Sequence, residues 1–231
     1  MSGHSKWNNI KRKKEKTDAQ KAKIFTKVGR EIAVAVKAGG ADPAVNGKLR
    51  DLIAKAKSLN VPNDNIQRII KKAEGAEKDD YESITYEGYG PSGIAMMVET
   101  LTDNRNRTAG NLRHYFDKFG GNLGNNGCVS FLFTEQGVIV LDVEDKDDFD
   151  MADGVAEVTT SPEAFSEVRQ ALEEKGYEFI SADVAMVPST RTALTDPDDL
   201  KKMGLLLDHL EEDDDVQNIW HNLENEEDLD R

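Results

Sequence analysis

The sequence predicts an α+β protein with several domains, and three observations lead to this prediction. Apolar residues recur at helical spacing through residues 18–75. From residue 81 onward, short strand-like runs alternate with helical segments. The length of 231 residues also exceeds the size of most single cores. We therefore expect an N-terminal three-helix domain followed by two ferredoxin-like α/β modules, with the distal module inserted into the middle one.

The helical domain, with the segment that precedes it, should occupy residues 1–80. Its first helix begins near Thr17 or Asp18, either of which can cap it, and stops at the glycine pair 39–40. Helices over about 47–59 and 62–75 follow. Each helix carries an apolar face, and these faces should pack together. The residues concerned are Ile24, Val28, Ile32, Val36, Leu49, Leu52, Ile53, Ala56, Ile66, Ile69, Ile70 and Ala73.

The middle module is expected to be discontinuous and to comprise residues 81–135 plus 196–231. Its first part predicts strands at 81–88 and 94–101, a helix at 108–119 and a strand in CVSFLF at 128–133. A four-stranded sheet with two helices on one face still lacks one helix and one strand. The C-terminal part supplies them at 197–211 and 216–220.

The distal module should occupy residues 136–195. Its predicted elements are strands at 137–143 and 155–161, a helix at 161–176 and a strand at 178–187.

The charge of the chain is strongly divided. The formal net charge is −14, yet residues 1–80 hold 19 basic and 10 acidic side chains, whereas residues 81–231 hold 11 and 34. Within residues 1–37 the ratio is 11 basic to 3 acidic. Such a division indicates one part that binds a polyanion and another that avoids it.

We predict that this basic segment, an arm continued by the first helix, contacts nucleic acid. Its cations would neutralise phosphates, and Trp7 could stack on a base. The alternative is a solvated terminus without a ligand. The candidate residues in the arm are Lys6, Trp7, Lys11, Arg12, Lys13, Lys14 and Lys16, and those on the helix are Lys21, Lys23, Lys27 and Arg30.

A second candidate site lies in TDNRNRTAGNLR, residues 102–113. Arg105 and Arg107 fall at the start of a predicted helix, where the helix dipole disfavours cations. They could bind a phosphate or an acidic partner there. The alternative is a structural role, with ion pairs to carboxylates such as Glu99 or Asp103. Arg113, further along the helix, has the same two interpretations.

The sequence gives little support for catalysis, and we expect no enzyme, cofactor or metal site. The four histidines lie far apart, and the lone Cys128 can neither form a disulfide framework nor anchor a zinc site. The loops GYGPSG and GGNLGNNG lack the strand-to-helix context of phosphate-binding loops. Without a membrane-length apolar run or a secretory signal, we expect a cytoplasmic location.

Several motifs together resemble the YebC/PmpR family, which is related to the mitochondrial translational activator of cytochrome oxidase subunit one. They are GHSKW, KAKIFTKVGREI, YEGYGPSG, TDNRNRT, GGNLG and CVSFLF, in the same order along the chain. The resemblance implies three domains, the middle one discontinuous, and a non-enzymatic role in gene expression. Some members are described as probable transcriptional regulators that bind DNA. Others are described as ribosome-associated translation factors that relieve stalling.

One segment departs from the family pattern. Relatives usually carry a helix between the first two strands of the distal module, but here only the short, mostly acidic residues 144–154 connect them. We expect the distal module to be truncated there, unless a segment is missing from the sequence.

Two nucleic-acid targets and one other class of partner remain open. A translation factor that contacts ribosomal RNA is favoured, because RNA is commonly recognised through shape and phosphates and an acidic body could face basic ribosomal proteins. A DNA-binding transcriptional regulator is the alternative, although no helix-turn-helix reader is evident. An adaptor whose arm docks an acidic protein is the third class. The oligomeric state is open, with a monomer slightly favoured.

Overall fold

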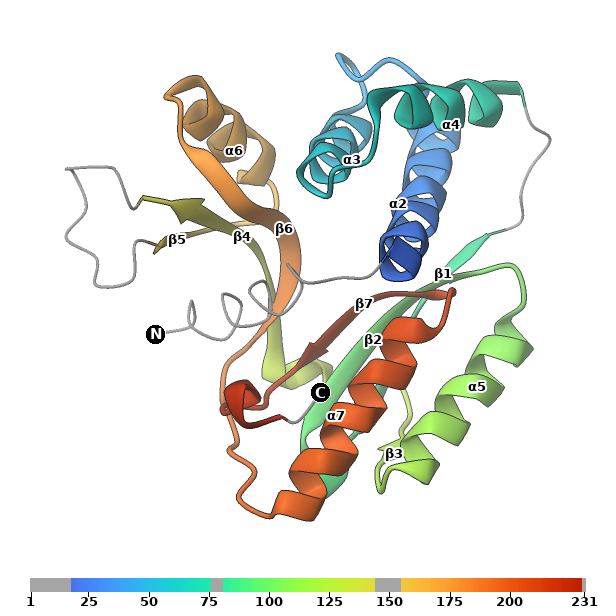
Figure 1. Cartoon of the computed structure of the whole chain (residues 1–231), viewed down its shortest axis with the longest axis vertical. Coiled ribbons are helices and arrows are strands. Elements are labelled where there is room, and N and C mark those ends of the chain that lie inside the picture. Colours follow the sequence, from blue (N-terminus) through green and yellow to red (C-terminus); the bar gives the residue numbers. More distant parts are fainter. Residues whose placement is uncertain (1–17, 76–80, 144–154, 230–231) are drawn as a thin grey trace. The chain divides into compact units, whose positions relative to one another are not determined.

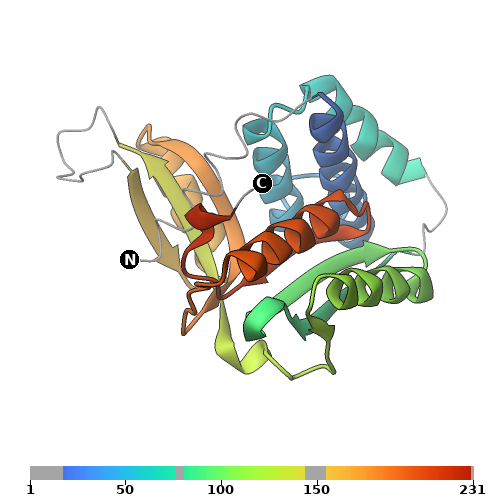
Figure 2. The same ribbon diagram turned by 60° about the horizontal axis from the view of Figure 1, so that its bottom comes forward.

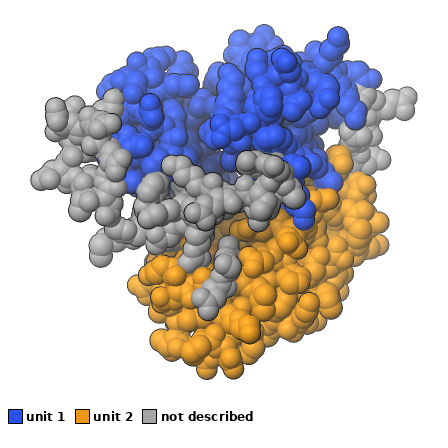
Figure 3. Space-filling model, in the orientation of Figure 1, with its two compact units in different colours: residues 1–76, 135–186 blue, residues 77–134, 187–231 orange. Residues whose placement is uncertain are grey.

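The computed structural model describes residues 18–75, 81–143 and 155–229 (Figure 1). The chain divides into two compact units, which Figure 3 distinguishes by colour. Unit 1 comprises residues 1–76 and 135–186, and unit 2 comprises residues 77–134 and 187–231.

The first part of unit 1 consists of three helices around one apolar core. These are α2 (Asp18–Gly39), α3 (Gly47–Ser58) and α4 (Asn63–Gly75). The buried Asn46 connects the end of α2 to the start of α3. Its side-chain oxygen accepts from the Leu49 N–H at 3.1 Å, and its side-chain NH2 group donates to the backbone carbonyl oxygens of Ala35 and Gly40 at 2.9 and 2.8 Å. This cap fixes where α3 begins.

The predicted apolar faces form this core. Among the predicted core residues of the first helix, Val28, Ile32 and Val36 are buried, whereas Ile24 is partly buried. Burial of such faces, more than intrinsic propensity, stabilises short helices. On α3 and α4 the predicted residues Leu49, Leu52, Ala56, Ile66, Ile70 and Ala73 are buried, and Ile53 and Ile69 pack against them.

Unit 2 contains a four-stranded antiparallel sheet in the order β3-β1-β2-β7. Its strands are β1 (Glu82–Tyr89), β2 (Ala95–Thr102), β3 (Asn122–Leu123) and β7 (Val216–His221). In the register Val98 lies opposite both Tyr86 and Ile219, so the C-terminal strand pairs directly with β2.

Two helices, α5 (Arg105–Lys118) and α7 (Pro197–Glu212), lie side by side on one face of this sheet (Figure 2). Alternation along the strands supplies the apolar face that they cover. Met96 and Val98 from β2, Phe116 from α5 and Leu206 from α7 are all fully buried in this core. Single 3-10 turns occur at η1 (Pro91–Gly93) and η3 (Glu226–Asp228).

The strand predicted in CVSFLF is wrong. Residues Ser130–Leu132 form the 3-10 turn η2, and the next strand, β4, begins only at Phe133. The reason lies in the backbone donors of this segment. The N–H groups of Gly127, Val129 and Ser130 donate to the Glu87 carboxylate, so they take no part in a strand ladder.

A three-stranded sheet in the order β5-β4-β6 occupies the rest of the chain. Its elements are β4 (Phe133–Asp142), β5 (Val155–Thr160), α6 (Phe165–Glu174) and β6 (Glu178–Pro188). Ile139, Leu141 and Phe165 form its small core. The shortened segment expected at 144–154 lies outside the described residues. The predicted α+β class, a helical region followed by two antiparallel sheets, is confirmed.

Candidate nucleic-acid interface

The described cations of the first helix lie on one side of α2. At 100° per residue, Lys23, Lys27, Arg30 and Lys37 fall within an arc of ~80°, opposite the buried face. All four side chains are partly exposed, and each also interacts with other groups of the chain. Lys37 was not among the predicted residues, although its spacing from Arg30, two turns away, places it on the same face. The helix therefore presents a basic surface beside an apolar core.

The remaining cations of this candidate site are not covered by the structure. Lys6, Trp7, Lys11, Arg12, Lys13, Lys14 and Lys16 lie outside the described residues, as does the side chain of Lys21. Their role stays a prediction from the sequence.

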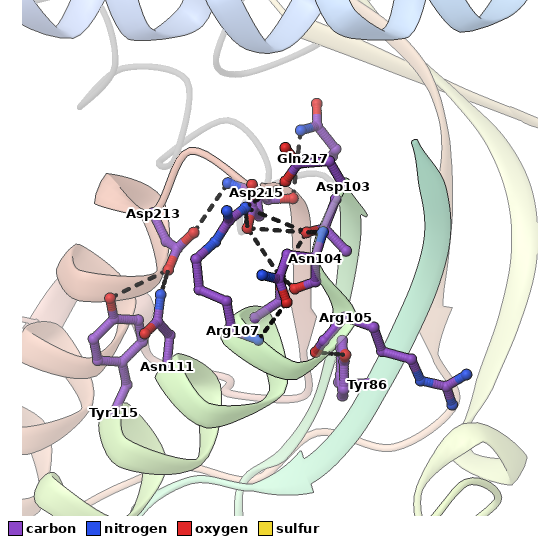
Figure 4. Close-up of polar contacts among 12 residues, drawn as sticks. Tyr86, Asp103, Asn104, Arg105, Arg107, Asn111, Tyr115, Asp213, Asp215 and Gln217 are labelled. Atoms are coloured by element: carbon purple, nitrogen blue, oxygen red, sulfur yellow. Dashed lines mark hydrogen bonds and ion pairs between the residues drawn. The ribbon is translucent and has the colours of Figure 1, made fainter. Parts of the chain in front are cut away.

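The second candidate site lies at the N-terminus of α5, in unit 2. The Asn104 side chain caps this helix by accepting from the Arg107 N–H at 3.1 Å. The cap places Arg105 and Arg107 in the first turn, since α5 begins three residues before the predicted start at residue 108, and Arg113 lies further along the helix. The two first-turn arginines then differ sharply in their surroundings (Figure 4).

Arg107 is held by carboxylates. Its guanidinium donates to Asp103 at 2.8 Å and to Asp215 at 2.7 Å. Asp215 is only 4% exposed and also accepts from the hydroxyls of Thr102 and Thr108, at 3.2 and 2.8 Å. Burial alone would raise the pKa of Asp215, but the hydrogen bonds from Arg107 and Thr108 hold that pKa below its usual value. These contacts fit the structural interpretation of Arg107.

The partners of Arg107 match the sequence analysis in part. Asp103 was named there as a candidate partner, and it does pair with Arg107. Glu99, the other candidate, instead accepts from the Asn218 amide at 2.6 Å. Asp215 was missed because it lies at the far end of the chain, in an acidic run that gave no sign of a buried member.

A neighbouring carboxylate extends the network toward the middle of α5. Asp213 accepts from the Asn111 amide and from the Tyr115 hydroxyl, both at 3.2 Å (Figure 4). Burial and the charge of Asp213 raise the pKa of the Tyr115 hydroxyl, which therefore stays protonated at neutral pH and acts as a donor. The acidic run before β7 thus holds α5 in place.

The side chains of Arg105 and Arg113 are exposed. Figure 4 shows the Arg105 side chain pointing away from Asp215. It is 67% exposed, and its nearest carboxylate oxygen, of Glu82, lies 3.7 Å away. An exposed pair of this kind contributes little to stability. Arg113 is also exposed. An anion that contacts Arg105 would therefore break no buried ion pair of that side chain.

Glu87 is a buried carboxylate that sequence reasoning did not single out. It is 8% exposed and accepts from three backbone N–H groups, at 2.8 Å from Gly127, 2.9 Å from Val129 and 2.8 Å from Ser130. Burial would raise its pKa, but these hydrogen bonds lower it overall. No sequence signal marks a glutamate on a strand for this role, because its partners are backbone groups.

The described residues show neither a metal centre nor a membrane span. They contain no group of three or more His, Cys, Asp or Glu side chains placed to hold a metal ion. No helix among them combines the length and apolar character needed to cross a bilayer.

Comparison with known proteins defines the class of this fold. A crystal structure of a conserved hypothetical protein from Aquifex aeolicus matches with a TM-score of 0.80 and 40% sequence identity, over 90% of this chain and 92% of that one. The model of the TACO1/YebC N-terminal domain matches residues 5–76, and that of the TACO1/YebC second and third domains matches residues 81–223. The chain belongs to the TACO1/YebC family.

Proteins similar to this chain are named as regulatory proteins. Proteins from Acetivibrio thermocellus and Ruminiclostridium cellulolyticum, each called a probable transcriptional regulatory protein, are 57% identical to this chain. The first alignment covers 96% of this chain and 98% of the relative, and the second covers 98% of both. The alignments span 238 and 243 positions, more than the 231 residues here, so both relatives have residues without a counterpart in this chain.

Proposed function

We propose that this protein is a non-enzymatic regulator of gene expression that binds nucleic acid through its basic arm and the partly exposed basic face of α2. The observation that carries the proposal is the concentration of 11 basic against 3 acidic side chains in residues 1–37 of a chain with a net charge of −14. The one-sided placement of Lys23, Lys27 and Arg30 supports it, because cations on one helix face can follow a line of phosphates.

The target that we favour is ribosomal RNA, with the protein acting as a ribosome-associated translation factor that relieves stalling. Phosphate contacts suffice for this binding mode and need no base-reading helix in a major groove. The excess of 34 acidic over 11 basic residues in 81–231 would be repelled by the flanking phosphates of a long duplex. The same acidic excess could instead contact the basic proteins that a ribosome displays beside its RNA.

The test is sedimentation of the tagged full-length chain from a cell lysate through a sucrose gradient. We expect it to migrate with ribosomes at low salt and to leave them as salt rises, because released counterions weaken phosphate contacts. Nuclease treatment should also release it. Protein that stays at the top of the gradient under every condition would overturn the ribosome proposal.

A DNA-binding transcriptional regulator is the second candidate, and the names of the relatives favour it. The two candidates are separated by titrating the same preparation with duplex promoter DNA and with single-stranded RNA at matched salt. A specific affinity for the duplex, lost when its sequence is scrambled, would favour the DNA-binding role.

A further inference from the structure

Phe131 is an aromatic side chain that the fold leaves outside the core. It is 73% exposed, whereas Val129 and Phe133 on either side of it are buried. Of the four large apolar side chains that are exposed among the described residues, Phe131 is the one aromatic. It lies in the turn η2, where the strand predicted from the sequence does not form.

Hydrogen bonds on both sides of Phe131 fix the backbone that carries it. The Glu87 carboxylate accepts three N–H groups from residues 127–130, and the Tyr89 hydroxyl donates to the Cys128 carbonyl oxygen at 3.0 Å. The three bonds to the Glu87 carboxylate are charge-assisted, and such bonds are stronger than hydrogen bonds between neutral groups. On the C-terminal side, the Leu132 carbonyl oxygen accepts from the N–H of Ser189 at 2.8 Å. Phe131 is therefore presented by an ordered loop.

The glycines of the loop are required by its geometry. A Cβ atom on Gly121 would lie 2.3 Å from the Tyr89 carbonyl oxygen, and one on Gly124 would lie 2.5 Å from the Cys128 sulfur. Gly127 has a φ of +89°, which side-chain-bearing residues rarely adopt. A loop fixed in this way loses little conformational freedom when a ligand binds.

The side chains of the loop that carries Phe131 are uncharged. Residues 119–134 contain no Asp, Glu, Lys or Arg, and Asn125 and Asn126 are exposed in the same loop. The side chains of the loop itself therefore carry no negative charge that would repel a phosphate-bearing strand, and the Glu87 carboxylate that holds the loop is buried.

We propose that Phe131 is a stacking platform for an unpaired nucleobase, with the amides of Asn125 and Asn126 available to the edges of that base or its neighbour. This inference rests on the proposed nucleic-acid function. It adds a contact with bases, at Phe131, to the contacts with phosphates made by the basic arm and α2. Exposed aromatic rings bind single-stranded nucleic acid in this way, because every base has a π-face. A protein-binding hot spot would instead sit within an apolar patch, whereas the exposed residues along this loop include Asn125, Asn126 and Gly127 and no large apolar side chain besides Phe131.

The test compares Phe131→Ala with the parent chain in binding a fluorescently labelled single-stranded RNA of 12 mixed nucleotides. We expect the Kd to rise by about 5- to 150-fold, the range for losing one stacked base. The slope of log Kd against log salt should not change, because no charge is removed. Phe131→Tyr should bind like the parent. Val45→Ala is the matched control, since Val45 is an equally exposed apolar side chain, 79%, in the helical domain.

A second experiment uses fluorescence to detect stacking directly. In Phe131→Trp, the fluorescence of the introduced indole, measured against the parent with its Trp7 and Trp220, should be quenched by the RNA. An abasic strand of equal length should not quench it. The thermal midpoints of all variants should match the parent, because the ring contributes little to the core.

Unchanged RNA affinity in Phe131→Ala would overturn the stacking proposal. If a variant with Lys11, Arg12, Lys13 and Lys14 changed to Glu then still weakened binding, the proposed nucleic-acid function would stand without a stacking site. If Phe131→Ala lost ribosome co-sedimentation at unchanged RNA affinity, the ring would dock on a protein instead. A parent chain that binds neither RNA nor DNA would overturn both proposals.

Discussion

Arg107 donates to Asp215 across 2.7 Å and 108 positions of sequence, and this pair connects the first turn of α5 to the start of β7. The Asp215 carboxylate also accepts hydrogen bonds from the hydroxyls of Thr102 and Thr108. The backbone carbonyl oxygen of Asp215 accepts from the Leu101 N–H at 2.8 Å. The pair thus lies where the end of β2, the cap of α5 and the C-terminal strand meet. It joins both parts of a unit whose chain is interrupted by residues 135–186.

Loss of the Asp215 carboxylate should destabilise unit 2. In Asp215→Ala the hydroxyls of Thr102 and Thr108 lose a charged acceptor, so we expect the free energy of unfolding to fall by about 2 kcal/mol. Urea denaturation followed by circular dichroism measures this change. Asp117→Ala, at an exposed position of α5 in the same unit, is the control and should behave like the parent. Equal stability of the two variants would contradict a structural role for Asp215.

Substitutions of the two arginines in the first turn of α5 should differ in their effect on thermal stability. Arg107→Ala should lower the thermal midpoint, because it breaks the contact with the buried Asp215. Arg105→Ala should leave the midpoint unchanged, because that side chain is 67% exposed. If Arg105 contacts a phosphate, its removal should reduce the salt slope of RNA binding by about 1. A large fall in the midpoint of Arg105→Ala would instead indicate a structural role for that residue.

The Glu87 carboxylate should make stability depend on pH. Its pKa in the folded chain is lower than the ordinary 4.5, so the stabilisation is fully present above that value and is lost as pH falls below it. Glu87→Gln removes the charge, and we expect it to lower the free energy of unfolding at pH 7 by about 1–3 kcal/mol.

The difference between the parent and Glu87→Gln should then shrink as pH falls from about 5 to 3. Denaturant titrations of both proteins across this range measure it. A difference that stays constant with pH would show that the carboxylate charge is not what holds residues 127–130.

The basic arm should account for most of the phosphate contacts. Changing Lys11, Arg12, Lys13 and Lys14 together to Glu should abolish ribosome co-sedimentation without altering the thermal melt. With about five phosphates neutralised, the parent chain should bind single-stranded RNA with a log–log salt slope of roughly −3.5. Lys57→Glu, at an exposed lysine of α3, serves as a control for a single charge reversal outside the arm. Unchanged co-sedimentation of the quadruple variant would exclude the arm as the binding element.

On α2, the triple change of Lys23, Lys27 and Arg30 to Gln should weaken RNA binding and reduce the magnitude of the salt slope by up to about 1.4, because at most two of the roughly five phosphates are left for α2. The same fluorescence titration measures it, with thermal melting as the check on folding. An unaltered slope would restrict phosphate binding to the arm.

The amino-acid sequence by itself determined the local elements and the division of charge. The helices end at their caps and glycines, and the apolar faces of α2, α3 and α4 are the buried ones, because helical periodicity and capping are properties of neighbouring residues. The basic excess of residues 1–37 is likewise a fact of composition. That a C-terminal helix and strand complete the middle sheet followed from counting the elements that this sheet needs.

Only the tertiary structure decided which polar residues are partners. Asp215 and Glu87 are each buried by contacts with groups 40 or more positions away, and Glu87 binds backbone N–H groups that no side-chain pattern reveals. For the same reason residues 130–132 of the strand-like run CVSFLF form a turn, and the Phe131 side chain is exposed. Long-range hydrogen bonds overrode local propensity there, because a buried carboxylate must be satisfied by whichever donors the fold brings to it.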